Sequence, residues 1–430
     1  MHPYIAAAIG PKRSGLAEFD GGFVAAARAN VDGAVDGRSG PQRADRGVAG
    51  CLATFVLGSV AQGAPFVLVA AELERRDVGS GWLAAVAAVR MAPYLLCSPF
   101  AGALAGRYAT RTVFAATGIS RGALITALWI GLGMGAPALV LVSLLFLLIA
   151  VGTPNFPALM RAVHHTAPHA RLDRTSALAA GLESAAFGAG PAFGGVLLLT
   201  DTTNSLLVCV AMMLVSAWIA TYVPNAERTT RRIDGRSSRL VRDAGWCLVG
   251  PGIRTAIVAV LGVNVLAGIN AALLVRLPDG LDLGGARAFG LLSFVSGAGA
   301  FAAFVALLAP IPRGRRPLIP LITAGAAIGV LAATSELPVA LIACCVLGAS
   351  ILTAEVLVIS TLGRALPGPL VAPAFGVLDA LMIGAMVTGA AVAPVLTATV
   401  GLRSTLAIAA IGIPLLASSV LLSRPDRAGR

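Results

Sequence analysis

Five ionisable residues of this 430-residue chain lie inside long apolar segments: Arg90, Arg121, Glu183, Glu355 and Asp379. Ionisable groups are costly inside hydrocarbon, so those that occur there are functional candidates by default. A carboxylate in a cavity of low dielectric loses hydration and holds its proton more tightly. It can take up and release a proton as the cavity alternates between wet and closed, which is the chemistry that proton coupling requires.

Glu183 and Asp379 are the strongest candidates for proton coupling. Each follows a leucine in its apolar segment, about two turns from the expected cytoplasmic end, and a glycine and a proline come later in the segment. The two residues therefore hold matching positions in the two halves of the chain. A static pair with an arginine or a backbone amide is the alternative. Glu355 is a third coupling candidate, for which a structural hydrogen bond is the competing interpretation.

The remaining polar groups in the apolar segments also have two interpretations. Arg90 and Arg121 either face a cavity, where they attract anions, or pair with acids; for Arg121 we expect a pair between helices. Uncharged polar residues line a substrate path or bond across helices, and they are Gln62, Asn155, Asn264 and Asn270.

Catalytic and metal chemistry finds little support. His165 and His169 have the i, i+4 spacing of helical metal ligands, but Pro168 interrupts the helix, and we expect both, with His164, in a solvated loop. The apolar segments contain no nucleophile–base or metal-ligand set, and the phosphate-binding motif GxxxxGK[ST] does not occur. We therefore expect no enzyme activity, no cofactor and no metal.

The composition requires a membrane. Hydrophobic residues make up 57% of the chain and charged residues 12%, with a mean hydropathy of +0.87. Soluble proteins average about 25% charged residues, and about 20 apolar residues make one spanning helix, which gives roughly twelve spans. Soluble enzymes, disordered chains, disulfide scaffolds and outer-membrane barrels are excluded. The six cysteines show no CxxC spacing, so we expect neither disulfides nor a zinc site.

The apolar segments form two sets of six. They cover about 48–71, 81–105, 112–133, 138–157, 176–199 and 205–223, then 253–275, 287–309, 317–334, 338–362, 372–396 and 403–422. We expect an all-α membrane protein with twelve transmembrane helices in two six-helix halves, 48–223 and 253–422. A central cytoplasmic loop, 224–252, joins them. Residues 1–47 predict a disordered cytoplasmic tail, and residues 423–430 a short second one. Such halves form a parallel repeat about an axis normal to the membrane.

The distribution of basic residues predicts the orientation. With the N-terminus inside, the expected cytoplasmic segments hold 25 lysines and arginines, and the outer segments hold five. Basic residues collect on the cytoplasmic side of membrane proteins. We therefore expect a multi-pass protein of the cell membrane with both termini in the cytoplasm. The same rule explains the net charge of +12 without nucleic acid as a partner.

Three short motifs lie where helices would have to pack or turn. The turn after the second segment contains Gly102, Gly106, Arg107 and Arg111, and the turn after the eighth ends with Arg313, Arg315 and Arg316. The fifth segment contains Gly190, Pro191, Gly194 and Gly195. Small residues at this spacing let helices approach closely, and Pro191 can bend its helix at the junction between the halves. Ordinary positive-inside loops and packing faces are the alternatives.

Together these motifs resemble the major facilitator superfamily, over residues 48–422. The first resembles its signature GxLADRxGR, the second a decayed repeat of that signature, and the third the antiporter motif GxxxGPxxGG. The context resembles the drug and siderophore exporter branch, with Arg90 and Pro93 before the signature and Arg161 to Leu178 after the fourth helix.

The sequence also departs from that pattern. Gly106 replaces the acid of the signature, Ala109 its second glycine, and Ala186 the first glycine of the antiporter motif. In the family the acid helps to lock the two halves on the cytoplasmic side, so the resemblance implies a weaker lock here. The fourth helix lacks the arginine found in many proton-coupled drug exporters.

The resemblance implies a monomeric secondary transporter in the lipid bilayer, working by alternating access. The leading expectation is proton-coupled efflux of a small amphipathic molecule by antiport. An uptake permease of the same fold and a membrane sensor or scaffold that does not transport are the alternatives.

Overall fold

The computed structural model describes residues 41–77, 80–166, 172–198, 202–223, 237–274, 277, 286–307, 317–366 and 368–422. Most of the two predicted tails, and the predicted motif residues Arg313, Arg315 and Arg316, lie outside the described residues. The first helix begins at Pro41, so its start lies within the segment that was expected to be disordered up to residue 47.

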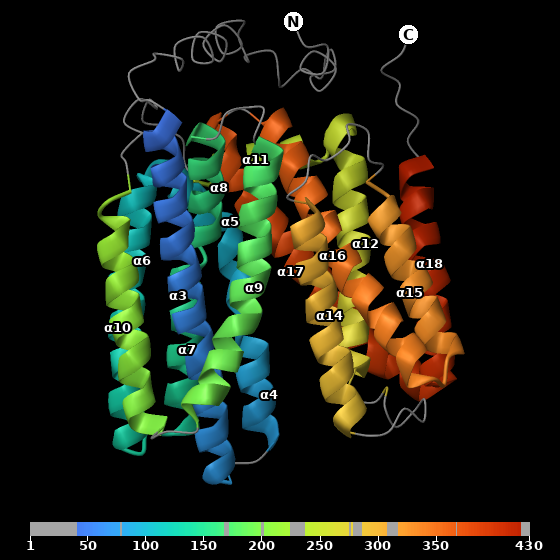
Figure 1. Ribbon diagram of the computed structural model, residues 1–430, viewed down its shortest axis with the longest axis horizontal. Helices are drawn as coiled ribbons and strands as arrows, with labels where there is room; N and C mark the ends of the chain where they lie inside the picture. Colours follow the sequence, from blue (N-terminus) through green and yellow to red (C-terminus); the bar gives the residue numbers. More distant parts are fainter. Residues whose placement is uncertain are drawn as a thin grey trace, which may run out of the picture.

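The N-terminal half is a bundle of helices, on the left of Figure 1. Its helices are α3 (Pro41–Arg75), α4 (Ser80–Val89), α5 (Ala92–Arg107), α6 (Thr110–Gly133), α7 (Ala138–Gly152), α8 (Asn155–Thr166), α9 (Leu172–Leu197) and α10 (Thr202–Ala220). The C-terminal half lies beside it and consists of α12 (Pro251–Leu273), α14 (Ala286–Leu307), α15 (Ile319–Ala333), α16 (Leu337–Ala365), α17 (Gly368–Val400) and α18 (Leu402–Leu422).

These helices confirm the expected all-α architecture in two six-helix halves. Seven described helices are long and apolar enough to cross a membrane, and α10, α14 and α15 contain shorter apolar stretches. The helix α9 and the pair α4–α5 complete twelve segments that run from one end of the bundle to the other (Figure 1). The start of α3 and the end of α18 lie at the same end, which we call the terminal side; the opposite end is the far side.

Two of the twelve segments are broken, where the sequence indicated single helices. The second segment turns at Arg90 and Met91, and Pro93 lies in the first turn of α5, where its missing N–H costs no helical hydrogen bond. The fourth segment turns at Thr153 and Pro154 between α7 and α8. Each break places a polar residue, Arg90 or Asn155, at a helix terminus within the bundle.

The fourth segment is also longer than expected. The helix α8 continues to Thr166, so His164 and His165 lie on a helix instead of in the predicted loop, while His169 lies outside the described residues. Arg161 is buried in the same helix. The expected boundary was too early because apolarity falls after residue 157 while the helix itself continues.

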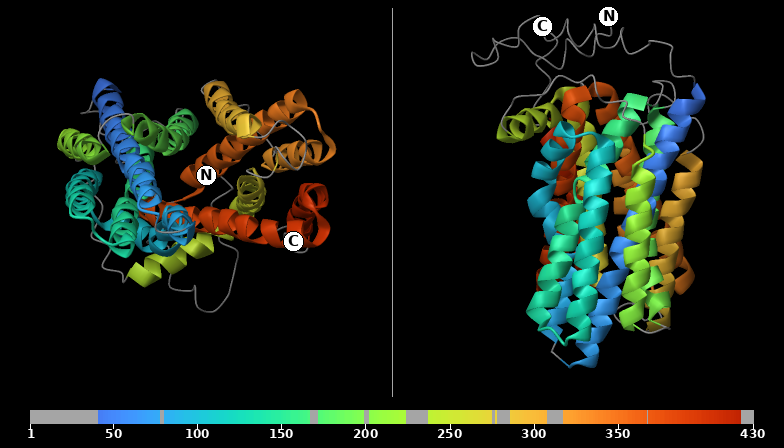
Figure 2. Two further views of the ribbon diagram at one scale, coloured as in Figure 1. Left: turned by 90° about the horizontal axis from the view of Figure 1, so that it is seen from below. Right: turned by 90° about the vertical axis from the view of Figure 1, so that its left-hand side faces the viewer.

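The central loop contains a helix that the sequence analysis missed. The amphipathic α11 (Ser237–Leu248) lies across the terminal side of the bundle (Figure 2) and packs against α5, α12 and α17. Ala244 and Leu248 on its inner face are buried in the main hydrophobic core. The loop is therefore part of the contact between the halves at this end.

The two halves repeat the same helix contacts. The first and fifth segments of each half pack closely, α3 against α9 and α12 against α17. A Cβ atom added at Gly63 would lie 2.8 Å from the Cα of Gly190, and one at Gly389 would overlap the carbonyl oxygen of Val265. Glycine is required at these positions because the two backbones meet there. The parallel repeat inferred from the sequence is thus seen in the structure as the same close packing of the first and fifth segments in both halves.

The halves meet most closely on the terminal side. There α5 packs against α17, α8 against α17, and α9 against α14 and α16. Ala105, Val113 and Ala158 of one half form a small buried cluster with Ala372 of the other. On the far side, the substantial packing partners of α4 are α3, α5 and α7, all from its own half. The terminal side is therefore the closed end of this conformation.

Candidate functional site

A pocket in the N-terminal half gathers four of the predicted polar residues. Gln62, Arg90, Arg121 and Asn155 line it together with Glu183. The pocket has an empty volume of about 590 Å³, which includes space open to the outside. Its apolar wall contains Phe55, Phe66, Ile149 and Phe156. These residues come from α3, α6, α7, α8 and α9 and from the break between α4 and α5, so only the folded half assembles them.

Arg121 is the centre of the polar wall of this pocket. Only 3% of the residue is exposed. Its Nη1 donates to Oε1 of Gln62 at 2.7 Å and to the carbonyl oxygen of Gly58 at 3.4 Å, and its Nε donates to the carbonyl oxygen of Thr117 at 3.4 Å. The expected interhelical pair therefore exists, but its partner on α3 is an amide and not an acid.

The same polar wall continues on both sides of Arg121. Thr117 donates to Oδ1 of Asn155 at 2.7 Å, which links α6 to the start of α8. Gln62 donates to the hydroxyl of Tyr94 at 3.5 Å, which links α3 to α5. The expected bonding between helices is thus found for Gln62 and Asn155, at positions that also line a cavity.

The three candidate carboxylates come from both halves and lie near one another. Glu183 belongs to α9, Glu355 to α16 and Asp379 to α17. Ser184, the residue after Glu183 on α9, donates to Glu355, and Asp379 is an electrostatic neighbour of Glu183. All three side chains are partly buried, and none has a cation within 4.0 Å among the described residues. The alternative of static pairs with an arginine is therefore not found.

Each carboxylate of the C-terminal half faces a serine of the N-terminal half. Ser98 of α5 donates to Oδ2 of Asp379 at 2.5 Å. Ser184 of α9 donates to Oε2 of Glu355 at 3.5 Å, a much weaker geometry. These two bonds cross the interface between the halves, so they depend on the halves being closed at this level.

Glu183 and Asp379 do occupy equivalent places. Each lies 11 residues after the first residue of its helix, Leu172 in α9 and Gly368 in α17. At about 3.6 residues per turn this is roughly three turns from the end, one turn deeper than the sequence indicated. The difference arises because both helices begin about four residues before the apolar segment begins.

Tyr94 and Ser98 were missed in the sequence, although a signal for them exists. Tyr94, Ser98, Gly102 and Gly106 follow one another at intervals of four and therefore share one face of α5. Gly102 and Gly106 on this face meet α17, and Ser98 bonds to it. The spacing rule, applied upstream from the glycine motif, would have found both residues.

The signature turn lies at the closed end. A Cβ at Gly102 would lie 2.6 Å from the carbonyl oxygen of Ala372 and 2.9 Å from the Cα of Gly376, whereas a Cβ at Gly106 would only touch Pro373 at 3.4 Å. Arg107 and Arg111 are exposed, as expected for residues at headgroup level. The absence of a side chain at Gly102 thus allows the backbones of α5 and α17 to approach closely.

The glycine–proline motif of the fifth segment packs within its own half. The helix α9 continues through Pro191, and Cβ atoms at Gly190 and Gly194 would meet the backbone of α3 at Gly63 and Ala64. Nothing lies within 4 Å of a Cβ at Gly195. The glycines of this motif therefore face the first segment of their own half, while α9 also meets α14 and α16 of the opposite half.

Two predicted polar residues of α12 do not line the pocket. Asn264 donates to the carbonyl oxygen of Val260 in its own helix at 2.9 Å. The Oδ1 atom of Asn270 accepts no hydrogen bond from a described residue. Neither side chain forms a cross-helix bond to a residue that the structure describes, although the sequence allowed one.

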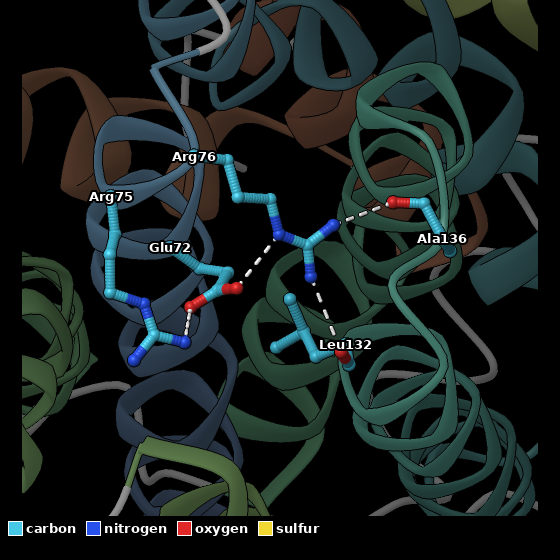
Figure 3. A network of polar contacts seen from close by, with 5 residues as sticks. All are labelled: Glu72, Arg75, Arg76, Leu132 and Ala136. Carbon is cyan, nitrogen blue, oxygen red and sulfur yellow. Dashed lines mark hydrogen bonds and ion pairs between the residues drawn. The ribbon is translucent and has the colours of Figure 1, made fainter.

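Arginine side chains form hydrogen bonds to helix C-termini at both ends of the N-terminal half. Arg161 donates to the carbonyl oxygens of Ala105 at 2.7 Å and Tyr108 at 2.9 Å, and so caps the end of α5. On the far side, Glu72 pairs with Arg75 and Arg76 (Figure 3). Arg76 also donates to the carbonyl oxygens of Leu132 at 3.2 Å and Ala136 at 2.9 Å at the end of α6. Cations at helix C-termini satisfy carbonyl groups that the helix leaves free.

Comparison with known proteins gives structural neighbours only. No protein-family model matches the chain, and no curated protein matches its sequence. Among solved structures, the human organic anion transporter MFSD10 (TETRAN) aligns with a TM-score of 0.72 at 16% identity, covering 89% of this chain and 100% of that one. A bacterial homologue of the iron transporter ferroportin, in an outward-facing state, gives a TM-score of 0.65 at 16% identity, covering 88% of this chain and 98% of that one.

A third neighbour connects the fold to a named superfamily. The fucose:proton symporter FucP of E. coli aligns with a TM-score of 0.63 at 17% identity, covering 87% of this chain and 98% of that one. FucP is described as a major facilitator superfamily transporter. By their titles, all three neighbours are transporters or a homologue of one. The chain, a multi-pass helical membrane protein, has the major facilitator fold.

Proposed function

We propose that this protein is a proton-coupled secondary transporter that moves a small amphipathic molecule across the cell membrane by alternating access. The observation that carries the proposal is the group of three carboxylates, Glu183, Glu355 and Asp379, between the two halves. They come from both halves, negative charges on neighbouring acids repel one another, and Glu183 lines a pocket of mixed polar and aromatic character. A proton taken up by this group relieves the repulsion, and its binding is therefore linked to the geometry of the interface.

The serine bonds supply the link between proton and conformation. When the terminal side is closed, Ser98 donates to Oδ2 of Asp379. When the halves separate there, that donor leaves and water takes its place. An ionised Asp379 thus gains a charge-assisted bond from closure, while a protonated Asp379 gains less. Protonation of this residue consequently favours opening of the terminal side.

The orientation completes the proposal. We infer from the 25 basic residues against five that the terminal side faces the cytoplasm. The structure then has its closed end inside, and the site would be reached from the outer side of the membrane in this state. A proton from outside would reach the carboxylates in this state and be released inside after the halves have rocked.

The direction of cargo movement has two candidates. Export in exchange for protons is favoured by the exporter-like motifs of the sequence. Import together with protons is favoured by the composition of the pocket wall, which contains Arg90, Arg121 and Glu183. An anionic cargo held by the arginines would favour the protonated form of Glu183, so that cargo and proton bind together. The neighbouring structures are named for organic anions, iron and a sugar, so their titles do not agree on one cargo.

The test is transport in cells under an imposed pH gradient. Cells that express the chain are loaded with, or exposed to, a panel of dyes and antibiotics, and the gradient is applied in either direction. We expect at least one compound to move at a rate that depends on the gradient and falls to the level of empty-vector cells when a protonophore is added. A panel that moves identically in expressing and empty-vector cells would contradict the proposal.

A further inference from the structure

We propose that the pocket of the N-terminal half binds the anionic group of an organic acid, and that Arg121 holds the negative charge. This inference rests on the proposed function and names the class of its cargo. It starts from the position of the arginine, which lies in the middle of α6 (Thr110–Gly133) and is 3% exposed. A charge at this depth of a membrane protein requires compensation.

Among the residues that the structure describes, Arg121 has no counter-ion. No carboxylate lies within 4.0 Å of its guanidinium group among the described residues. The three acceptors that it uses are the amide of Gln62 and the carbonyl oxygens of Gly58 and Thr117, all of them neutral. A buried cation with neutral partners alone is an unfavourable arrangement, which an anionic ligand would relieve.

The surroundings of Arg121 are built to hold it at the pocket. A Cβ at Gly58 would lie 2.8 Å from its Nη2 atom, and a Cβ at Gly152 would lie 3.5 Å from its Cδ and overlap Oε1 of Gln62. Any larger residue at either position would displace the guanidinium group or its partner. The glycines at these two positions, one on α3 and one on α7, thus leave the space that the side chain of Arg121 and its partner Gln62 occupy.

The guanidinium group retains donor capacity toward the cavity. Its Nε and Nη1 atoms donate to protein acceptors, while its Nη2 atom donates to none among the described residues. The residue lines the pocket. Arginine matches carboxylate and phosphate groups with paired donors, so an anion that enters the pocket meets an unused N–H group and an uncompensated positive charge.

The apolar part of the pocket wall indicates the chemistry of the rest of the ligand. Phe55, Phe66, Phe156 and Ile149 line the pocket opposite a few polar groups. Aromatic walls of this kind bury an apolar or aromatic body. The cargo class is therefore an amphipathic organic acid with one anionic group and an apolar body.

An anionic cargo also decides how cargo and proton are coupled. Glu183 lines the same pocket as Arg121, so a bound anion repels the ionised form of Glu183 and favours its protonated form. Cargo and proton then bind together. The inference consequently favours cotransport over exchange, against the antiport expected from the sequence motifs.

The test is ligand binding to the purified full-length protein in detergent, measured as a thermal shift without any gradient. The probes are arylalkanoates of increasing length, such as 4-phenylbutyrate, each paired with its neutral primary amide. We expect the carboxylates to raise the Tm of the unaltered protein more than the amides do. Arg121→Gln should weaken carboxylate binding about tenfold or more, Arg121→Lys should weaken it less, and the surface variant Arg403→Gln should leave it unchanged.

A second variant keeps the test decisive if Arg121→Gln does not fold. Gln62→Glu places a carboxylate of nearly the same shape 2.7 Å from Nη1 of Arg121, where it acts as an internal counter-ion. We expect this variant to be at least as stable as the unaltered protein without ligand and to lose the preference for carboxylates. A purely structural role of Arg121 predicts no loss.

The outcomes separate this inference from the proposed function. Equal binding of acids and amides, or a Gln62→Glu variant that binds acids as tightly as the unaltered protein, would overturn the inference while gradient-driven transport in cells could still stand. Binding of acids that depends on Arg121, in a protein that moves nothing under a gradient, would support the inference and refute the transport proposal.

Discussion

At the scale of single residues, the proposed mechanism makes the bond between Ser98 and Asp379 one determinant of the closed state of the terminal side. A hydrogen bond to a charged group contributes about 1.5–3 kcal/mol, so Ser98→Ala should shift the equilibrium toward the open terminal side about tenfold or more. The measurement is the distance between spin labels at Tyr108→Cys and Ala365→Cys, on the terminal ends of the two halves, in a cysteine-free background. Ser184→Ala is the matched control, because its bond to Glu355 is 3.5 Å long and should contribute much less. Equal distance distributions in all three proteins would show that the bond does not hold the halves together.

The sequence contained part of this residue-level picture. Glu183, Glu355 and Asp379 stood out because acids are rare in apolar segments, and they do lie near one another. The partners did not stand out, because a serine or tyrosine in a membrane helix costs little and carries no comparable signal. The neutral partner of Arg121 could not be predicted either, since Gln62 is as suited to helix packing as to holding a guanidinium group.

At the scale of helices, the backbone contact between α5 and α17 is the main closure of the terminal side. Gly102→Ala places a methyl group 2.6 Å from the carbonyl oxygen of Ala372, so the two helices must separate. Gly106→Ala, one turn away, only brings a methyl group into contact with Pro373 at 3.4 Å. We expect the first variant to lengthen the distance between the same spin labels and the second to leave it nearly unchanged. A longer distance in both, or in neither, would contradict the role given to Gly102.

The glycine motif of α9 makes a different prediction, because it packs against α3 within one half. Gly194→Leu places its Cβ 2.8 Å from the carbonyl oxygen of Ala64, whereas Gly195→Leu enters open space. Overpacking costs about 1–3 kcal/mol, so Gly194→Leu should lower the Tm of the purified protein, and Gly195→Leu should not. Both variants should still insert. A Tm that is unchanged in Gly194→Leu would show that α3 and α9 can separate without cost.

Hydropathy predicted the number and order of the helices, but not where they break or which neighbour they touch. The turns at Arg90 and Thr153 interrupt segments that are apolar throughout, and α11 was missed because its apolar residues alternate with basic ones. The partner of Gly190 could not be predicted, because a glycine motif indicates a close contact without identifying the helix that makes it. Only the fold supplies that second helix.

At the scale of the whole molecule, the orientation in the membrane sets the meaning of every other result. Gly235→Cys lies in the central loop, and Met134→Cys lies at the far-side turn between α6 and α7, where the native residue is 80% exposed. In a cysteine-free background, an impermeant thiol reagent should label position 134 in intact cells and position 235 only after the membrane is opened. The reverse labelling pattern would show that the terminal side faces outward, and the inferred direction of proton entry would then also be reversed.

The most direct measurement for the whole account is transport by carboxylate variants in proteoliposomes. The cargo is the compound that gives the strongest gradient-dependent movement in cells, and two rates are measured: accumulation driven by a pH gradient, and exchange of labelled for unlabelled cargo without a gradient. Glutamine and asparagine keep the shape of the acids but carry no exchangeable charge. We predict that Glu183→Gln or Asp379→Asn abolishes the driven accumulation while exchange continues. If both variants accumulate cargo under the gradient as the unaltered protein does, the carboxylates do not couple transport to protons.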